Sequence, residues 1–287
     1  MQMSRKFILP VVAAIAIVAG CTPKIQKPTE ICPGKNSVDQ ALAALQSNSQ
    51  NMVPFRANGQ CTLEYYAEGK SKPQSESLTV QQLWVEPPVN IYLQGDKIAI
   101  PRAMILGSNK EEFWLAIRPE ISLYCWGRWS EQDASEGPTI NPRTLLEALG
   151  IGEIDTAQDW SLSNQGPYDI LTKRERGVIT KKIHIFSCDY RVRKIEFFDS
   201  NGQVAAVAEL DKYEEVSEGF FIPTLIKATT YSQSERDKPF SFTFDLQRIR
   251  PTQIKEQQRN YLFKRRPSEG FKNVGRIVNG EWIDESE

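Results

Sequence analysis

Residue types that commonly carry enzyme chemistry are scarce in this sequence. Its 287 residues include one histidine, His184, and no G-x-S-x-G segment supplies a nucleophilic serine to partner it. Ile183 and Ile185 share one face of the strand expected here, so His184 points to the other face. Adjacent glutamates at 111–112 and 214–215 adjoin turn-like residues, as solvated charges do, and do not suggest a glycosidase site. We expect a binding protein, not an enzyme, with no cofactor and no metal site.

Four cysteines form a second set with chemical potential. No C-x-x-C spacing occurs among Cys32, Cys61, Cys125 and Cys188, which argues against a zinc knuckle or a thioredoxin-like site. In an exported protein they permit two disulfides and three connectivities. We expect Cys32–Cys61, which would tie the start of the first helix to the strand after it. We expect Cys125 and Cys188 to form the second disulfide, and a pair of buried thiols on neighbouring strands is the alternative.

The first twenty residues have the parts of a bacterial export signal. Two basic residues precede an apolar run at 7–20, which as a helix spans about 21 Å, too little to cross a hydrocarbon core of about 30 Å. The run ends in Val-Ala-Gly before Cys21, which resembles the lipobox of bacterial lipoproteins. An ordinary secreted protein is the alternative. We expect residues 1–20 to be a lipoprotein signal peptide, Cys21 to carry the lipid anchor and residues 21–35 to form a lipidated tether.

Charge and composition exclude several classes of partner. Lysine and arginine total 35 against 36 aspartates and glutamates, a net charge of −1, so there is no basic excess to attract nucleic acid. Hydrophobic residues at 40% and charged residues at 25% are ordinary globular values. Thr22, not aspartate, follows Cys21, which favours the outer membrane over the inner. The expected location is the bacterial cell envelope, anchored by lipid to the outer membrane and facing the periplasm.

A basic segment lies near the carboxyl end. Within residues 248–276 there are nine basic and two acidic residues, and acidic residues follow them. One interpretation is a surface for anionic lipid headgroups or an acidic protein partner; the other is a solvated face partly neutralised by the acidic tail. We treat residues 251–287 as a basic then acidic C-terminal extension, whose basic surface is centred on Lys264, Arg265 and Arg266.

The body of the chain has the period of β-strands. Apolar residues spaced by three and four predict a helix at 37–49, capped by Asn36 or Ser37. Pro142 with Gly150 predicts a short helix at 142–149, capped by Asn141, between loops at 137–141 and 158–166. Short runs rich in branched and aromatic residues, bounded by turn residues, predict strands. These runs lie at 60–67, 78–85, 90–93, 113–117, 168–171, 179–186, 191–198, 204–210, 221–231 and 240–249.

These elements define the expected fold class. It is mainly β (α+β), with eleven to thirteen strands in a strongly curved antiparallel sheet forming an unclosed β-barrel, and with helices over the concave face. The domain is expected to span residues 36–250.

A family resemblance rests on the order of these elements and on loose strand patterns. The segments are LWVEPPVNIY at 83–92, LGSNKEEFWL at 106–115, RKIEFFDSNG at 193–202 and FIP at 221–223. Together with the N-terminal helix they resemble the Lol-type superfamily of outer-membrane lipoprotein carriers and receptors. The resemblance implies an open barrel whose hydrophobic concave face holds acyl chains, and the lipobox makes the chain similar to the receptor type.

Under that resemblance, the function is to bind lipid or lipoprotein acyl chains in lipid transport or outer-membrane insertion. A different reading is a structural or sensing lipoprotein that uses the same scaffold to bind a protein partner. Acyl chains gain about 0.8 kcal/mol per buried methylene, so transport needs no catalytic residue. The expected lining residues, for which ordinary core packing is the alternative, are Leu42, Leu45, Leu83, Val85, Ile91, Leu93, Phe113, Leu115, Ile117, Phe240, Phe242 and Phe244.

Overall fold

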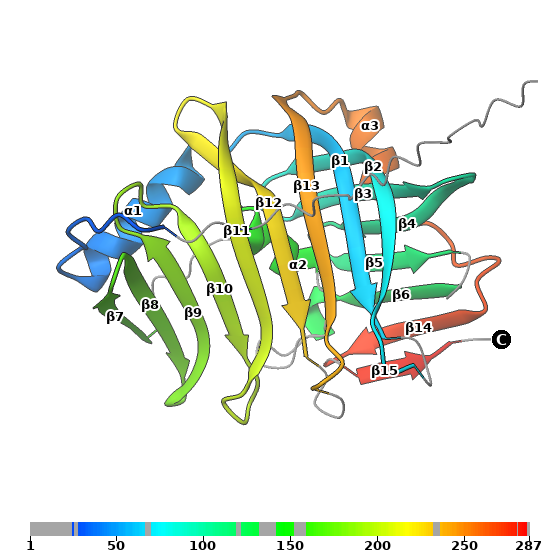
Figure 1. The fold of residues 1–287 in the computed structure, drawn as a ribbon. Coiled ribbons are helices and arrows are strands. Elements are labelled where there is room, and N and C mark those ends of the chain that lie inside the picture. The colour runs from blue at the N-terminus through cyan, green and yellow to red at the C-terminus, as the bar shows by residue number, and fades with distance from the viewer. Residues whose placement is uncertain are drawn as a thin grey trace, which may run out of the picture.

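The computed structural model describes residues 25, 28–66, 70–118, 122–131, 142–151, 159–231, 236–279 and 281–285. They form one strongly curved sheet of fifteen strands, which has two edges and is not closed into a barrel (Figure 1). The strand order is β15-β14-β6-β5-β4-β3-β2-β1-β13-β12-β11-β10-β9-β8-β7. The mainly β class, the strong curvature and the open barrel predicted from the sequence are confirmed.

The elements have these bounds. The helices are α1 (Val38–Gln50), α2 (Pro142–Ala148) and α3 (Glu256–Leu262), with a short 3-10 helix at Trp129–Glu131. The strands are β1 (Phe55–Tyr65), β2 (Gln74–Glu86), β3 (Asn90–Lys97), β4 (Ile100–Ser108), β5 (Glu112–Ile117), β6 (Leu123–Arg128), β7 (Asp159–Gln165), β8 (Tyr168–Glu175), β9 (Val178–Phe186), β10 (Val192–Phe198), β11 (Val204–Ser217), β12 (Phe220–Thr230), β13 (Phe240–Pro251), β14 (Asn273–Val278) and β15 (Glu281–Asp284).

The sheet consists of two antiparallel meanders. The first runs from β1 to β6 and the second from β7 to β13, and the antiparallel pairing of β1 with β13 joins them. Across this seam Leu63 lies opposite Phe242 and Cys61 lies opposite Phe244. β14 adds to the β6 edge as a parallel strand. The seam therefore joins segments that are far apart in the sequence.

Alternating residues explain why the sheet has a buried concave face. On β13, Phe242, Phe244 and Leu246 are buried, while Thr243 and Asp245 between them are partly exposed. Because successive side chains of a strand point to opposite faces, this alternation directs one row of apolar side chains inward. The buried rows of both meanders meet in one hydrophobic core inside the curve.

Each strand predicted from the sequence overlaps an observed strand, but the expected number was too low. β4, β6, β14 and β15 were not predicted. The segment at 158–166 was predicted to be a loop, and this was wrong, because residues 159–165 form the edge strand β7. Only Trp160 and Leu162 of β7 are apolar and partly buried, whereas the residues between them are polar and exposed. An edge strand covered on one face needs few apolar residues, so composition alone did not reveal it.

The segment after residue 250 is part of the same sheet assembly. It contributes α3 and the strands β14 and β15, which extend the β6 edge. α3 packs on the convex face, where Leu262 and Phe263 contact a small cluster that contains Tyr92 and Ile254. Arg259 of α3 donates hydrogen bonds to the carboxylate of Glu86 on β2. These contacts fix the start of the C-terminal segment to the first meander.

The two predicted helices form and lie on the concave side. Ser37 caps α1, because its hydroxyl oxygen accepts a hydrogen bond of 3.3 Å from the Gln40 backbone. α1 contacts β7, β8 and β12. α2 ends at Ala148, and Gly150 two residues later has a positive φ of 74°, which suits glycine after a helix end. The Asn141 cap expected for α2 lies outside the described residues.

α2 occupies the space inside the curve of the sheet (Figure 1). It contacts β11 of the second meander and β4 of the first, which are far apart in the strand order. Leu145, Leu146 and Leu149 of this segment are all buried. The helix therefore fills the middle of the concave side and separates the space on either side of it.

The expected disulfide connectivity was wrong. Cys32 is bonded to Cys188, with 5.0 Å between their Cα atoms, while Cys61 and Cys125 are free thiols. Cys61 lies on β1 and its side chain points into the hydrophobic core, so it cannot reach the segment before α1. The turn between β9 and β10 reaches that segment instead, because the second meander curves round to α1. Both interpretations of Cys125 and Cys188 were wrong as well, because Cys188 is bonded to Cys32. Cys125 is a partly buried free thiol, and desolvation raises its pKa to about 11.

Candidate functional site

A cleft of about 650 Å³ lies between α1, α2 and the inner face of the second meander. This volume is within the range of about 300–1,000 Å³ typical of small-molecule sites. Five basic and two acidic side chains line it, together with aromatic and aliphatic residues. Its charged and aromatic members are Lys35, Lys110, Lys173, Lys181, Arg191, Glu147, Asp189, Trp129, Trp160, Tyr190, Tyr213 and Phe221.

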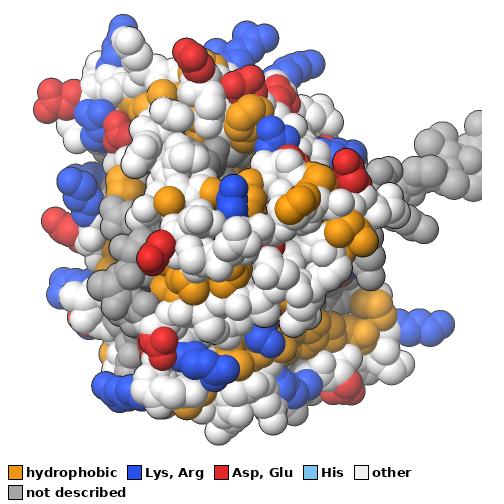
Figure 2. Space-filling view, turned by 90° about the vertical axis from the view of Figure 1, so that its left-hand side faces the viewer, with side chains coloured by type: hydrophobic (Ala, Val, Ile, Leu, Met, Phe, Trp, Pro, Cys, Tyr) orange, Lys and Arg blue, Asp and Glu red, His pale blue; other side chains and the backbone are white. Residues whose placement is uncertain are grey.

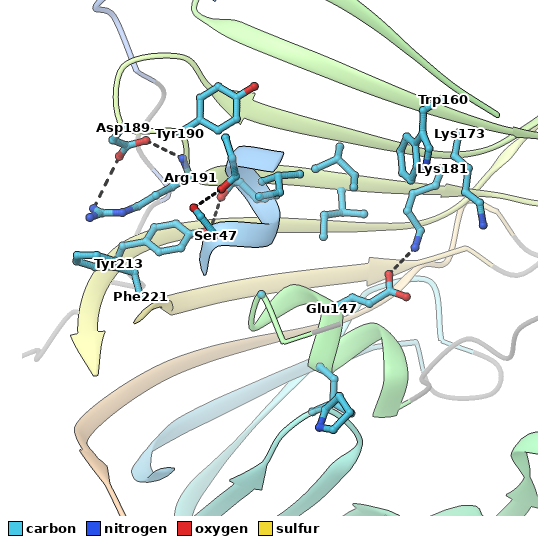
Figure 3. Close-up of a pocket in the computed structure, with 18 of the residues that line it drawn as sticks. Ser47, Glu147, Trp160, Lys173, Lys181, Asp189, Tyr190, Arg191, Tyr213 and Phe221 are labelled. Atoms are coloured by element: carbon cyan, nitrogen blue, oxygen red, sulfur yellow. Dashed lines mark hydrogen bonds and ion pairs between the residues drawn. The ribbon is translucent and has the colours of Figure 1, made fainter. Parts of the chain in front are cut away.

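One end of the cleft carries two lysines beside a tryptophan (Figure 3). Lys173 on β8 and Lys181 on β9 are direct register partners, and Trp160 on β7 is the partner of Lys173. Lys181 Nζ lies 2.7 Å from a carboxylate oxygen of Glu147, which comes from α2. Lys173 Nζ lies 2.7 Å from Glu175. This end therefore places two ammonium groups on neighbouring strands beside a tryptophan, and the carboxylate of Glu147 faces them from the helix.

The other end is aromatic and is centred on the turn between β9 and β10 (Figure 3). The Arg191 guanidinium lies 4.0 Å from the centre of the Phe221 ring, and it also contacts Asp189 at 3.8 Å. Tyr213 is partly buried beside them, and desolvation raises its pKa. Arginine over aromatic faces is a favourable arrangement in a partly dehydrated site. The two ends of the cleft thus differ in their chemistry.

Asp169 fixes the segment before α1 to this aromatic end. This carboxylate is 1% exposed, and it accepts hydrogen bonds from the Lys35 backbone at 2.8 Å and from Asn164 at 2.6 Å. The Tyr190 hydroxyl bonds to the same carboxylate at 3.2 Å. Burial and, next, the nearby Asp169 carboxylate raise the pKa of Tyr190. With the Cys32–Cys188 disulfide, these contacts hold Lys35 and Tyr190 in place as walls of the cleft.

The floor of the cleft between its ends is aliphatic. Ile183 on β9 and Ile195 on β10 are register partners, and both line the cleft. Leu45 of α1 and Leu146 of α2 line it from the helices. An elongated ligand with an apolar body would contact this floor while its polar ends met the charged groups described above.

A second, smaller cavity is wholly apolar. Its volume is about 30 Å³, room for on the order of two water molecules. Leu145 of α2 lines it together with nine residues of the first meander and the seam. Six of the twelve side chains predicted to hold acyl chains line this small cavity: Leu93, Leu115, Ile117, Phe240, Phe242 and Phe244.

The other six predicted lining residues have different surroundings. Leu45 lines the larger cleft. The remaining five are buried and line neither space: Leu42, Leu83, Val85, Ile91 and Phe113. These side chains therefore point to the inner face of the sheet, as expected. However, α2 fills most of the space in front of them.

The predicted basic surface is partly engaged within the chain. The Arg265 guanidinium donates a hydrogen bond of 2.8 Å to Glu112 and lies 4.0 Å from the Trp126 ring centre. Arg266 lies over the ring of Tyr261, at 4.4 Å from its centre. Lys264 between α3 and this pair is exposed. The basic triplet thus helps to attach the C-terminal segment, and two of its three cations already have aromatic or acidic partners.

His184 lies outside the cleft, on the face opposite to the core. Its Nε2 is 2.7 Å from a carboxylate oxygen of Glu196, while Ile183 and Ile185 on either side are buried. Burial lowers the pKa of His184, although the Glu196 carboxylate opposes this shift. The prediction that the histidine faces away from the apolar row is confirmed.

Of the residues that line the cleft, sequence reasoning selected Leu45 but none of the charged or aromatic ones. Lys173, Lys181 and Trp160 lie in separate strands, and only the register of β7, β8 and β9 brings them together. A usable signal was present in β9, where Lys181 shares the face of Ile183 and Ile185. A lysine in an inward-facing row is uncommon unless it has a partner, and it could have marked the site.

Figure 2 shows the side of the molecule that carries α1 and β7. Hydrophobic side chains form several exposed bands on this face, with basic and acidic side chains between and around them. The surface is therefore mixed in character and not uniformly polar.

The fold was compared with solved structures. A putative outer membrane lipoprotein-sorting protein domain from Vibrio parahaemolyticus superposes with a TM-score of 0.52 at 11% identity, covering 78% of this chain and 97% of that domain. A LolA superfamily protein from Nitrosomonas europaea gives 0.49 at 13% identity, covering 80% and 99%. A DUF1329 family protein from Desulfovibrio piger gives 0.49 at 12% identity, covering 79% and 98%. No family model and no curated protein matches the sequence.

The comparison with the Vibrio domain shows that the chain has a Lol-type fold, as its strand patterns predicted. At 11% identity the likeness concerns the fold alone. Cys21 and the expected signal peptide lie outside the described residues. Among the helices that the structure describes, none combines the length and the apolar character needed to cross a membrane.

Proposed function

We propose that this protein is a lipid-anchored protein of the bacterial cell envelope that binds lipid or lipoprotein acyl chains in the cleft between α1, α2 and the second meander. Transport of lipids or lipoproteins, or their insertion into the outer membrane, is the process this binding serves. The observation that carries the proposal is the cleft itself, about 650 Å³ with an aliphatic floor, inside a Lol-type fold.

The cleft suits an acyl chain better than the small apolar cavity does. A buried chain gains about 0.8 kcal/mol per methylene, so even a partly covered chain binds favourably along an aliphatic floor. The cavity of about 30 Å³ behind α2 has no room for such a chain while Leu145 occupies its wall.

The proposal is for binding without catalysis. His184 is outside the cleft and paired with Glu196. The carboxylates that line the cleft, Glu147 and Asp189, each contact a cation, at 2.7 Å and 3.8 Å respectively. Asp189 is also held by Arg193 at 2.6 Å, so both carboxylates are engaged in ion pairs.

Filling the cleft tests the proposal. Ala44 of α1 lines the cleft, whereas its neighbour Ala43 is exposed and does not. The full chain is purified in a non-ionic detergent, loaded with a fluorescent fatty acid and titrated with monomyristoylglycerol, an uncharged single-chain lipid. We expect displacement in the wild type and in Ala43→Trp, and at least a roughly tenfold weaker affinity in Ala44→Trp, because the indole occupies the aliphatic floor.

Absence of displacement in folded wild-type protein would reject the acyl-binding proposal. It would favour the reading in which the scaffold binds a protein partner. Equal affinity of the two tryptophan variants would place the lipid elsewhere.

The lipid anchor is tested separately. Labelled palmitate should be incorporated into the wild type and not into Cys21→Ala, and incorporation into both would refute lipidation at Cys21.

A further inference from the structure

A row of side chains crosses the inner face of the second meander at the lysine end of the cleft. Trp160, Lys173, Lys181 and Phe197 are successive register partners on β7, β8, β9 and β10. Direct partners in antiparallel strands lie on the same face, with about 5 Å between Cβ atoms. The row therefore presents two ammonium groups side by side, with an aromatic ring at each end.

Two lysines directly opposite each other are unfavourable in a sheet, because like charges repel across the pair. Here the lysine side chains are also mostly covered, with 16% and 22% of their surface exposed. Glu175 and Glu147 each contact one of them at 2.7 Å. Each ammonium group retains further donors, because lysine carries three N–H groups.

The adjacent row on the same face is wholly aliphatic. Two residues further along each strand, Leu162, Leu171, Ile183 and Ile195 are register partners of one another. Leu171 is fully buried, and Ile183 and Ile195 line the cleft. We call the row that contains Lys173 and Lys181 the cationic row, and the row from Leu162 to Ile195 the aliphatic row. The two rows are about 7 Å apart, the rise of two strand residues.

We propose that the cationic row binds the phosphate of an anionic phospholipid headgroup while the acyl chain follows the aliphatic row. Lysine binds phosphate as a point charge, and two adjacent ammonium groups can share the oxygens of one phosphate. Excess positive charge in the whole cleft, five basic against two acidic side chains, acts in the same direction. This inference rests on the proposed acyl-binding function and names its ligand class.

The test compares ligands that differ in one group. The full chain in a non-ionic detergent is titrated with myristoyl-lysophosphatidylglycerol, which is anionic, and with monomyristoylglycerol, which has the same chain and no phosphate. Glycerol 1-phosphate supplies the phosphate without the chain. We expect the anionic lipid to bind about tenfold more tightly than the uncharged one, with glycerol 1-phosphate far weaker than either.

The variants assign the preference to the lysine pair. In Lys173→Gln/Lys181→Gln the two lipids should bind with equal affinity, because the preference for the phosphate is lost. Lys182→Gln is the matched control, since Lys182 is the next residue of β9 and points to the other face. It removes one positive charge, as each single variant does, and should keep the preference. If the double variant does not fold, each single variant should reduce the preference about threefold.

The outcomes separate the two proposals. Failure of monomyristoylglycerol to bind the wild type rejects acyl binding as a whole. Binding of both lipids with equal affinity, or a preference that survives in the folded lysine variants, rejects the headgroup site and leaves acyl binding intact. Glycerol 1-phosphate that binds as tightly as the anionic lipid would show a site for a free phosphate compound instead.

Discussion

Lys181 Nζ lies 2.7 Å from a carboxylate oxygen of Glu147, and this ion pair connects β9 of the sheet to α2 inside the curve. It is the polar contact between the cationic row and the helix that fills the concave side. An anionic headgroup bound to Lys181, as we propose, would compete with this carboxylate for the ammonium group. The ion pair therefore has two expected roles, one in holding α2 and one in limiting the affinity for anions.

The first prediction concerns this carboxylate. Glu147→Gln removes the competing charge, so the affinity for myristoyl-lysophosphatidylglycerol should rise about threefold, while that for monomyristoylglycerol stays constant. Stability should fall by less than about 1 kcal/mol, because the pair is partly exposed. Titration calorimetry and urea unfolding measure the two effects. Glu214→Gln, an exposed change on β11, is the control and should alter neither. A lower affinity for the anionic lipid in Glu147→Gln would contradict the prediction.

A second prediction concerns the cysteines. Burial raises the pKa of Cys61 to about 12 and that of Cys125 to about 11. At pH 8 the thiolate fractions are then on the order of 10⁻⁴ and 10⁻³, so alkylation of the native protein should be very slow. In urea without reductant, Cys61 and Cys125 should react, and Cys32 and Cys188 only after reduction. Peptide mapping by mass spectrometry distinguishes these sites; rapid labelling of Cys32 in the unreduced protein would contradict the bond.

The third prediction concerns the close approach of the segment before α1 to β8. A Cβ atom on Gly34 would lie 2.0 Å from an Asp169 carboxylate oxygen and 2.2 Å from the Asn164 amide nitrogen. Gly34→Ala should therefore displace this segment and destabilise the protein by about 1–3 kcal/mol, because the buried Asp169 loses donors. Thermal unfolding measures the loss. Gly95→Ala, whose nearest neighbour would be at 3.4 Å, should cost much less; equal losses would argue against the Asp169 contact.

The fourth prediction is a pH dependence. The hydrogen bond from Arg259 is the largest cause that lowers the pKa of Glu86 below its ordinary value of 4.5. A carboxyl group with a lowered pKa in the folded state adds stability above about pH 4.5, and this stability is lost as the pH falls through the lowered pKa. Arg259→Gln should therefore be less stable than the wild type at pH 7.

The difference between Arg259→Gln and the wild type should shrink as the pH falls from 5 to 3, because Glu86 is then protonated in both proteins. Denaturant unfolding at pH 7, 5, 4 and 3 measures it. Arg250→Gln, an exposed change on β13, should show no such trend. A difference that stays constant over this range would show that Glu86 is not the partner whose charge matters.

Local patterns were sufficient for the elements with strong internal signals. The alternation of Phe240 to Leu246 predicted β13, and the apolar spacing after Ser37 predicted α1 with its cap. Both signals depend on residues within one element, where periodicity and capping chemistry act directly. The overall class followed because many such segments share the period of two.

Long-range features could not be obtained in this way. The bond between Cys32 and Cys188 depends on the second meander curving back to α1, and the Lys173–Lys181 pair depends on a register that no single strand specifies. The edge strand β7 lacked a continuous apolar signal because one face of it is solvated. In each case the contact depends on two distant segments, and neither sequence by itself indicates which segment it will contact.

The seam between β1 and β13 has a consequence for the time course of folding. Within each meander, neighbouring strands are also consecutive in the chain. Each meander can therefore form from hairpins between adjacent strands, without closing a long loop. The seam closes a loop between residues such as Leu63 and Phe242, and closing long loops is the slow step in sheet-rich proteins. We therefore expect the two meanders to gain protection from hydrogen exchange first and the Leu63–Phe242 region last. Until then, β1 and β13 are both exposed edges and can pair with strands of other chains.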